Sequence, residues 1–447
     1  MDAAPQPRKH IAVLAFPFTT HAAPLLSLVR RISAVSVAGE IRFHFFSTRR
    51  SNAALFSGDG GGGDVEAHDV WDGVPEGHVF SGDPDEAVGM FLRSAVESFR
   101  AAIAAVGVEF RCLLTDAFLW FAAELAEEMH VPWVPFWTAG PRAMLVHVDV
   151  VNIRNQMGFN GPGDKTLDFL PDFSSVRTVD LPSGIISGDT EATIPSLLNK
   201  LGAYLPRAAA VATNSFEELD PVVVETLKSK LTRFLNIGPL ALTSPPPHVS
   251  DDEHRCLEFL SGKNPATVAY ISFGSLIVPP PPEISALAGA LEERKIPFLW
   301  SFRGNPDEIF PESFLERTKG LGKFVPWAPQ LRVLQNSSVG VFITHGGWNS
   351  VTESVIGGIP MICRPFFGDQ TLNVRTVEAV WGIGIGVEGN VFTKGSTLKA
   401  LEAVLVSKKG GVMRENLRKR RELAFAAVKP GGTSSENFKT LVDIITQ

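Results

Sequence analysis

The sequence has little cysteine and no excess of basic residues. Its 447 residues include only Cys112, Cys256 and Cys363, which are too few and too far apart for a disulfide framework or a paired-cysteine metal site. We therefore expect a reducing, cytoplasmic setting. Lys and Arg number 41 against 48 Asp and Glu, a net charge of −7, which argues against nucleic acid or an anionic membrane as partner.

Long apolar runs are also missing. No stretch reaches the roughly 18 apolar residues of a membrane span, so no membrane-spanning helix is expected. Residues 11–18 follow Arg8 and Lys9 as in a signal peptide, but Pro17 and the polar residues 19–21 favour a buried strand. A G-x-S-x-G turn of serine hydrolases is absent. Without a carboxylate cluster suited to Mg²⁺, no metal is expected.

What the sequence does contain is apolar material in a regular pattern. Apolar residues make up 45% and charged residues 20%, as in a core-forming globular protein. Runs that are apolar at nearly every position alternate with helical patterns; the runs are 11–16, 43–47, 112–115, 133–136, 268–273, 298–302, 339–344 and 361–363. Such runs are typical of strands buried on both faces of parallel sheets. The sequence predicts an α/β protein with doubly wound sheets.

The length allows two or three domains. Between two rounds of strand–helix alternation lie Pro239, the triple proline 245–247 and the acidic residues 251–253, a composition typical of a linker. We expect a first domain over 1–240, a linker over 241–255 and a second domain over 256–433. Five glycines within residues 58–64 predict an exposed loop.

The strongest local pattern is HGGWNS at 345–350, which follows the strand 339–344 and opens a helical pattern. Two glycines let a ligand approach the backbone, and a helix start offers N–H donors to a phosphate. Glu353 lies one turn beyond Asn349, where a carboxylate can accept hydrogen bonds from ribose hydroxyls. A simple N-cap after a tight turn remains the alternative.

A second candidate group lies in the first half. His21 stands in the loop after the first strand, and Asp116 ends the strand 112–115. Parallel strands bring their carboxyl ends to one edge of the sheet. A neutral imidazole can accept a proton from a substrate hydroxyl, and a carboxylate can orient it. The alternative for an isolated histidine is a capping or core role.

Residues 327–370 read WAPQLRVLQNSSVGVFITHGGWNSVTESVIGGIPMICRPFFGDQ. This segment resembles the signature box of plant family 1 UDP-sugar glycosyltransferases; Gly346 departs from the usual Cys. Segments 14–26, 71–80, 116–126, 135–141, 214–220 and 362–370 narrow the resemblance to flavonoid and anthocyanidin 3-O-glucosyltransferases. The resemblance implies two Rossmann-like doubly wound domains facing across a cleft (GT-B type), with a terminal helix 434–447 returning to the first domain.

The resemblance also implies roles for individual residues. The donor residues would be Trp327, Ala328 and Gln330 for the base and ribose, Glu353 for the ribose hydroxyls, His345, Asn349 and Ser350 for the diphosphate, and Trp348, Asp369, Gln370 and Thr138 for the sugar. Ser275 would also bind the donor. The acceptor residues would be Phe16, Thr20, Asp85, Phe118, His147 and Phe367. Asp85 is a departure, since relatives have Gln near it. Gln370 is the residue that usually accompanies glucose.

The implied reaction is inverting transfer of glucose from UDP-glucose to the 3-hydroxyl of a flavonol or anthocyanidin. It gives a 3-O-β-glucoside and UDP, with His21 as base and Asp116 as its partner. UDP-glucose is a co-substrate, no separate cofactor or metal is implied, and a monomer is the default expectation. Alternatives are a UDP-galactose donor, another phenolic acceptor, or a non-catalytic flavonoid or UDP-sugar binder.

A nicotinamide dehydrogenase is a further alternative. Gly384, Gly386 and Gly389 spell the G-x-G-x-x-G motif of dinucleotide-binding folds. That motif should follow a strand and open a helix, whereas here a helical pattern precedes it. The pattern favours a helix terminated by glycine.

Overall fold

The computed structural model describes residues 8–37, 39–57, 63–81, 84–161, 163–243, 252–275 and 277–447. Residues 58–62 of the predicted glycine loop and 244–251 of the predicted linker lie outside this part. The chain forms two compact units. The first comprises Met1–Gly163, Ser183–His248 and Ala427–Gln447, and the second comprises Asp164–Pro182 and Val249–Ala426. Each unit therefore takes segments from both sides of the predicted linker. The family resemblance implies the return of residues 434–447 to the first domain, whereas the sequence did not indicate that Asp164–Pro182 belongs to the second unit.

The first unit is built on a seven-stranded parallel sheet of order β3-β2-β1-β4-β5-β6-β7. Its strands are β1 (Lys9–Leu14), β2 (Ile41–Thr48), β3 (Val65–Val70), β4 (Phe110–Asp116), β5 (Trp133–Trp137), β6 (Val211–Thr213) and β7 (Phe234–Asn236). The strand order reverses direction between β1 and β4. At such a point the loops after the two strands diverge to opposite faces, which leaves room for a ligand.

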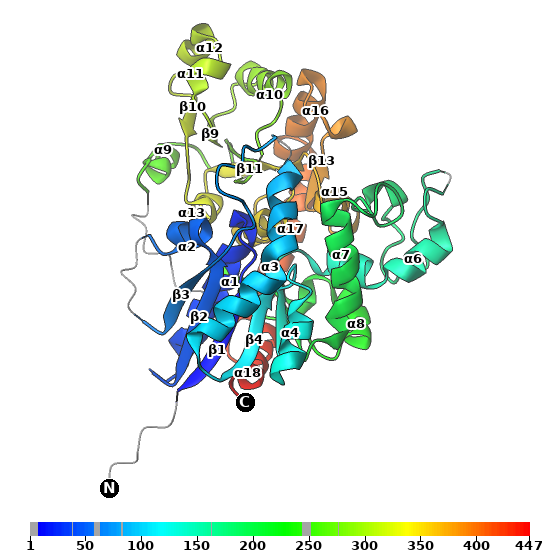
Figure 1. Cartoon of the computed structure of the whole chain (residues 1–447). Coiled ribbons are helices and arrows are strands. Elements are labelled where there is room, and N and C mark those ends of the chain that lie inside the picture. Colours follow the sequence, from blue (N-terminus) through cyan, green and yellow to red (C-terminus); the bar gives the residue numbers. More distant parts are fainter. Residues whose placement is uncertain are drawn as a thin grey trace. The chain divides into compact units, whose positions relative to one another are not determined.

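Helices flank this sheet (Figure 1). They are α1 (Thr19–Val35), α2 (Arg49–Leu55), α3 (Pro84–Val106), α4 (Ala122–Met129), α5 (Pro141–Val148), α6 (Val150–Met157), α7 (Thr193–Tyr204), α8 (Pro221–Lys230) and α18 (Thr433–Thr446). Ile11 and Val13 of β1 pack in one buried cluster with Leu25 of α1 and Leu441 of α18. The last helix of the chain thus completes the core of the first unit.

The second unit has a six-stranded parallel sheet of order β10-β9-β8-β11-β12-β13. Its strands are β8 (Val268–Ser272), β9 (Phe298–Ser301), β10 (Gly322–Val325), β11 (Val339–Thr344), β12 (Met361–Cys363) and β13 (Gly384–Gly386). Its helices are α9 (Cys256–Ser261), α10 (Pro281–Glu293), α11 (Pro306–Ile309), α12 (Glu312–Arg317), α13 (Gln330–Leu334), α14 (Trp348–Gly357), α15 (Gln370–Arg375), α16 (Lys394–Leu405) and α17 (Lys408–Ala427). The strand order reverses between β8 and β11.

The predicted α/β class and all eight predicted strands are confirmed, each within two residues at either end. One prediction is wrong in detail: Gly384 and Gly386 do not end a helix but form the strand β13. A Cβ at Gly384 would lie 2.7 Å from the carbonyl oxygen of Met361. Glycine is needed there because the neighbouring strand β12 lies so close, and no dinucleotide-binding turn is formed.

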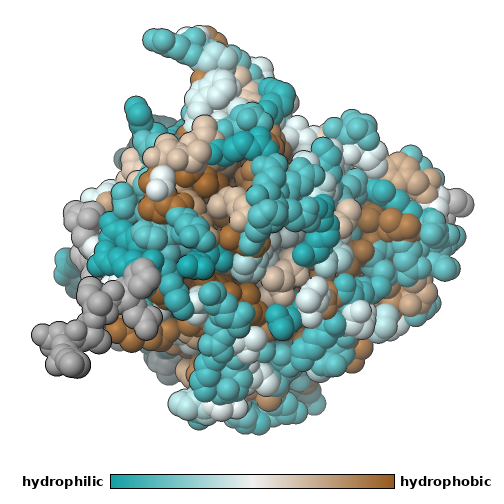
Figure 2. Space-filling view, turned by 60° about the horizontal axis from the view of Figure 1, so that its bottom comes forward, coloured by the Kyte–Doolittle hydropathy of each residue, from teal (hydrophilic) through white to brown (hydrophobic). Residues whose placement is uncertain are grey.

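The surface in Figure 2 is mostly hydrophilic, with hydrophobic residues gathered in small areas between polar ones. Isolated apolar areas of this kind are normal on a globular protein. Among the described residues, no helix has the length and apolar character needed to cross a membrane.

A buried ion pair fixes the start of α5 in the first unit. Nε and Nη2 of Arg142 donate to the two carboxylate oxygens of Asp220, both at 2.7 Å, and each side chain is only 4% exposed. Asp220 precedes the first residue of α8. The pair therefore connects the start of α5, which follows β5, with the start of α8, which lies between β6 and β7 in the sequence.

We expect Asp220→Asn to lower the free energy of unfolding by about 3 kcal/mol, because it leaves the buried Arg142 charge uncompensated. Lys439→Ala is the matched control: it breaks an exposed pair with Glu436 in the same unit and should change stability by no more than about 0.5 kcal/mol. Urea denaturation of both variants checks this. Equal losses in the two variants would contradict the role given to the buried pair.

Candidate functional site

The first candidate group lies where the strand order of the first sheet reverses. Leu14 of β1 pairs in register with Thr115 of β4, so the two strands end together. His21 lies in the first turn of α1, just beyond the predicted loop, and Asp116 is the last residue of β4. Nδ1 of His21 is 2.9 Å from Oδ2 of Asp116. The structure thus brings together two residues that are 95 positions apart in the chain.

The carboxylate of Asp116 is held rigidly. It is fully buried, and its Oδ1 accepts a 2.8 Å hydrogen bond from the backbone N–H of Phe118. Oγ1 of Thr138 lies 3.1 Å from the same Nδ1 of His21. Both partners of the imidazole contact Nδ1, so neither contact uses Nε2, the nitrogen that would meet a substrate proton.

Aromatic rings surround the imidazole of His21. The ring of Phe118 lies 4.3 Å from it and that of Phe16 lies 5.2 Å away, centroid to centroid. Phe91 of α3 packs edge-on against Phe16 at 5.6 Å. Phe16 and Phe118 were predicted from the resemblance, whereas Phe91 was not, because a phenylalanine on an amphipathic helix carries no distinguishing signal.

His147 extends this row of rings through Trp137, which lies 6.3 Å from Phe118 and 6.0 Å from His147. Its side chain is buried, and Nδ1 has no hydrogen-bond partner among the residues that the structure describes. Burial lowers the pKa of His147 to about 4, so the ring is neutral. A buried polar atom without a partner is costly, and a bound ligand hydroxyl would satisfy it.

Two other predicted acceptor residues are less well placed by the structure. Asp85 is exposed in the first turn of α3, six residues before Phe91. Thr20 follows the first residue of α1, but its side chain lies outside the part of the structure that is described.

The second candidate group lies at the corresponding reversal of the second sheet, where Ser275 follows β8 and His345 follows β11. The His345 ring lies between two glycines. A Cβ at Gly274 would come within 2.9 Å of this ring, and one at Gly347 within 2.4 Å. Burial lowers the pKa of His345 to about 4. The imidazole is therefore neutral and can offer a hydrogen bond, but no positive charge, to a diphosphate.

The helix α14 starts directly after these glycines. Gly347 is its N-cap residue, and no side chain caps the first turn. The N–H groups of residues 348–350 therefore point out of a ten-residue helix without a side-chain cap, and they carry the positive end of its dipole. Asn349 and Ser350 stand in this turn, as predicted. A phosphate is the ligand that such a turn favours.

Gln330 links three polar side chains. Its Nε2 donates to Oε2 of Glu353 at 2.7 Å and to Oγ of Ser350 at 3.2 Å, and its Oε1 accepts from the hydroxyl of Tyr270 at 3.2 Å. Desolvation raises the pKa of Glu353 to about 7, although the Gln330 hydrogen bond opposes the shift. Tyr270 was not predicted, because a tyrosine inside a buried strand reads as core.

The two predicted tryptophans differ in exposure. Trp327, which follows β10 and Pro326, is 49% exposed, as a stacking platform for a base must be. Ala328 next to it is buried. The indole of Trp348 is only 6% exposed and lies 6.3 Å from the ring of Trp381. The side chain of Trp348 therefore offers little accessible surface to a ligand.

Asn373 connects the centre of the signature segment with its end, and sequence reasoning missed it. Its Nδ2 donates to Oδ2 of Asp369 at 2.9 Å and to the carbonyl oxygen of Gly346 at 3.0 Å. Gly346 has a φ of +80°, and a Cβ there would lie 2.9 Å from Cγ2 of Val374. The departure from the usual Cys thus sits in a tight, left-handed turn that glycine tolerates best.

The loop after β12 is fixed from within. Oε1 of Gln370 accepts hydrogen bonds from the backbone N–H groups of Phe366 and Phe367, at 2.8 and 3.3 Å. Gln370 itself is buried, whereas Phe367 is 56% exposed. At the far end of α15, Nε of Arg375 donates to Asp180 at 2.8 Å. Asp180 belongs to the segment Asp164–Pro182, so this segment anchors the helix that Gln370 begins.

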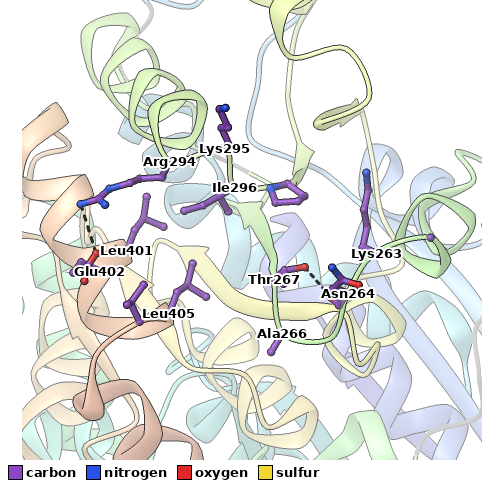
Figure 3. A pocket seen from close by; sticks show the side chains of 13 residues that line it. Lys263, Asn264, Ala266, Thr267, Arg294, Lys295, Ile296, Leu401, Glu402 and Leu405 are labelled. Carbon is purple, nitrogen blue, oxygen red and sulfur yellow. Dashed lines mark hydrogen bonds and ion pairs between the residues drawn. The ribbon is translucent and has the colours of Figure 1, made fainter.

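The second unit also has an open cavity of about 580 Å³ at the opposite edge of its sheet (Figure 3). It is lined by Gly262, Lys263, Asn264, Ala266, Thr267, Arg294, Lys295, Ile296, Pro297, Leu401, Glu402, Leu405 and Val406. Thr267 and Pro297 come directly before β8 and β9, so the cavity lies at the amino ends of the strands. None of the predicted site residues lines it.

Comparison with known proteins identifies the family of this chain. The family model described as UDP-glucoronosyl and UDP-glucosyl transferase matches residues 86–420. The chain is 50% identical to a flavonoid 3-O-glucosyltransferase of Medicago truncatula, over 98% of this chain and 97% of that protein. It is 48% identical to an anthocyanidin 3-O-galactosyltransferase of Actinidia chinensis var. chinensis, over 98% and 97%.

Among solved structures, a crystal structure of UDP-glucose:anthocyanidin 3-O-glucosyltransferase in complex with UDP matches with a TM-score of 0.92. The two are 38% identical over 99% of both chains. These matches confirm the resemblance drawn from residues 327–370 and the predicted two-sheet α/β fold. The chain belongs to the UDP-glucoronosyl and UDP-glucosyl transferase family.

Proposed function

We propose that this protein transfers glucose from UDP-glucose to the 3-hydroxyl of a flavonoid, a flavonol or an anthocyanidin, and releases UDP and a 3-O-β-glucoside. The observation that carries the proposal is the His21–Asp116 pair. The imidazole is held through Nδ1 by a buried carboxylate, and Nε2 is not used by that contact. Family membership and the similarity to flavonoid and anthocyanidin 3-O-glucosyltransferases support the choice of substrates.

In the proposed mechanism, His21 accepts the 3-hydroxyl proton at Nε2. Asp116 keeps the ring in the tautomer with the proton on Nδ1 and stabilises the imidazolium that forms, as carboxylates do in hydrolytic triads. The deprotonated oxygen attacks the anomeric carbon from the side opposite to UDP. The C–O bond to the diphosphate breaks as the new bond forms, so an α-linked donor gives a β-linked product.

The donor would be held by the second unit. The uncapped first turn of α14 and the neutral His345 would donate hydrogen bonds to the diphosphate, which stabilises the charge that builds up on the leaving group. The exposed Trp327 would stack on uracil, and Glu353 would accept from the ribose hydroxyls. Asp369 and Gln370 would bind the glucose hydroxyls, with Asn373 fixing the position of Asp369.

The acceptor would lie against the aromatic rings of the first unit. A flat polyphenol suits the faces and edges of Phe16 and Phe118, whose rings lie beside His21. The unpartnered Nδ1 of the buried His147 would bind a hydroxyl of the acceptor. The sequence departs from the family pattern at two of these positions. Glycine at position 346 has a steric explanation, because the turn there is tight and left-handed. The exposure of Asp85 supports a contact with the acceptor only at the solvent-exposed side of its site.

A direct test pairs UDP-glucose and UDP-galactose with a flavonol and an anthocyanidin, and determines the linkage of each product by NMR. We expect a 3-O-β-glucoside and a preference for UDP-glucose, because Gln370 is the residue that accompanies glucose. A preference for UDP-galactose would instead favour galactosyl transfer, the activity named for the Actinidia relative. Tight binding of both substrates with no product would favour a non-catalytic binder.

His21→Ala should lower kcat/KM by about 10³-fold, within the range for loss of a general base. Binding of UDP, measured by calorimetry, should not change, because His21 belongs to the acceptor group. His78→Ala is the matched control: this histidine pairs with Glu86 and not with Asp116, and the variant should keep full activity. Retention of activity in His21→Ala would refute the proposed base.

Affinity for UDP-glucose should rise about tenfold from pH 6 to pH 8. Because the pKa of Glu353 is raised to about 7, its carboxyl is mostly neutral at pH 6 and mostly ionised at pH 8, and only the ionised form accepts from both ribose hydroxyls. UDP-glucose itself does not titrate in this range. Calorimetry at three pH values measures the effect.

In Glu353→Gln the pH dependence should disappear, and the affinity should stay weak throughout. Glu388→Gln, which removes an exposed carboxylate of the same unit, should keep the wild-type dependence. A wild-type affinity that does not vary with pH would contradict the role of Glu353.

A further inference from the structure

A row of histidines crosses the first three strands of the first unit, away from the groups described above. His10 lies on β1, His44 on β2, and Glu66 and His68 on β3. In the register of these parallel strands the four residues fall at positions that share one face of the sheet. Residues such as Ile11 and Phe43 face the buried core with α1 and α18. The histidines and Glu66 therefore lie on the opposite face of the sheet. The strands are blue in Figure 1.

We propose that His44, Glu66 and His68 form a binding site for a Zn²⁺ ion. Each offers one ligand atom, and these atoms all lie within 4.8 Å of one another. Nδ1 of His44 is 2.9 Å from Nε2 of His68, and Oε1 of Glu66 is 3.9 Å from the same Nε2. Two imidazoles and one carboxylate are a zinc ligand set that leaves the fourth position to water.

The distances fit a small adjustment. Two ligand atoms of a tetrahedral Zn²⁺ lie about 3.3 Å apart, given bonds of about 2.0 to 2.1 Å. The two nitrogens must therefore separate by a few tenths of an ångström. Glu66 must approach Nε2 of His68 by about half an ångström and Nδ1 of His44, which lies within 4.8 Å, by no more than about 1.5 Å. Glu66 is 46% exposed and His68 is 22% exposed, so their side chains can move and the ion can enter from solvent.

His10 gives the row the orienting contact that metal-bound histidines use. Its Nδ1 lies 2.9 Å from Nε2 of His44. When His44 donates from Nε2 to His10, its Nδ1 carries a lone pair that faces His68 and Glu66. Metal ligands are commonly oriented through the other ring nitrogen in this way. Burial lowers the pKa of His44 to about 4 and also lowers the pKa of His68, so both rings are neutral.

The two carboxylate oxygens of Glu66 have different neighbours. Nη2 and Nε of Arg42 donate to its Oε2, at 3.0 and 3.3 Å. This leaves Oε1 on the side of His68. In the metal-free protein His68 donates from Nε2 to Nδ1 of His44; on binding, the proton of His68 moves to its own Nδ1, so the ring stays neutral and no proton is released.

The site would join an edge strand to its neighbour. β3 is the outermost strand of the sheet, and its sequence VEAHDV has few apolar side chains to hold it. A zinc ion bound by His44 of β2 and by two residues of β3 would connect the strands at the level of their side chains. Binding to the folded state alone would stabilise the unit.

The test uses full-length protein without a polyhistidine tag, stripped with a chelator and titrated with ZnCl₂ by calorimetry. We expect one equivalent to bind. Co²⁺ in its place should show the visible absorption of tetrahedral coordination. Amide hydrogen exchange in β3 should slow when Zn²⁺ is added. Absence of stoichiometric binding would refute the proposal.

Variants separate the site from adventitious binding. His68→Ala and Glu66→Gln change partly exposed residues and should weaken Zn²⁺ binding by about 100-fold or more, while His10→Ala should weaken it by about tenfold. His78→Ala, which alters another histidine–glutamate pair, should bind as the wild type does. Glycosyl transfer activity reports that each variant is folded. Unchanged affinity in His68→Ala and Glu66→Gln would overturn the assignment.

Discussion

Parallel pairing of strands decides where chemistry can take place in this molecule. Each backbone group of a central parallel strand is used by its neighbours, so a ligand meets the sheet only where strands end. The in-register pairing of β1 with β4 makes those strands end together, and His21 meets Asp116 although two helices and two further strands separate them in sequence. The same rule gathers Ser275 and His345 at the second sheet.

Glycine and burial then set the electrostatics of the donor group. Gly274 and Gly347 leave room for the His345 ring, and the resulting desolvation keeps that ring neutral. In the proposed donor site, the negative charge of a diphosphate would therefore be met by N–H groups and the dipole of α14. This explains how a chain of net charge −7 can bind a nucleotide: the favourable potential is local and does not depend on the overall charge.

Much of the fold followed from the sequence, because strands buried on both faces are continuously apolar. The strands that escaped prediction lack this signal: β3 is polar, β10 is Gly-Lys-Phe-Val, β13 is Gly-Ile-Gly, and β6 and β7 are only three residues long. Roles in the signature segment could be proposed from the family resemblance. The sequence did not reveal the contacts of Asn373, Tyr270 and Phe91, the burial of Trp348 or the raised pKa of Glu353, because these depend on packing between distant segments. The histidine row escaped for the same reason: its members are spread over three strands and acquire meaning only through register.

The interleaving of the two units bears on how the chain is made. Asp164–Pro182 leaves the ribosome long before Val249–Ala426, the segment with which it packs. Ala427–Gln447, whose helix α18 completes the core of the first unit, emerges after the other two segments of that unit and after Val249–Ala426. The first unit therefore cannot complete its core until the second unit has been synthesised, whereas the early segment of the second unit is already present when the rest of that unit is made. A chain truncated before α18 would expose the apolar residues that this helix covers.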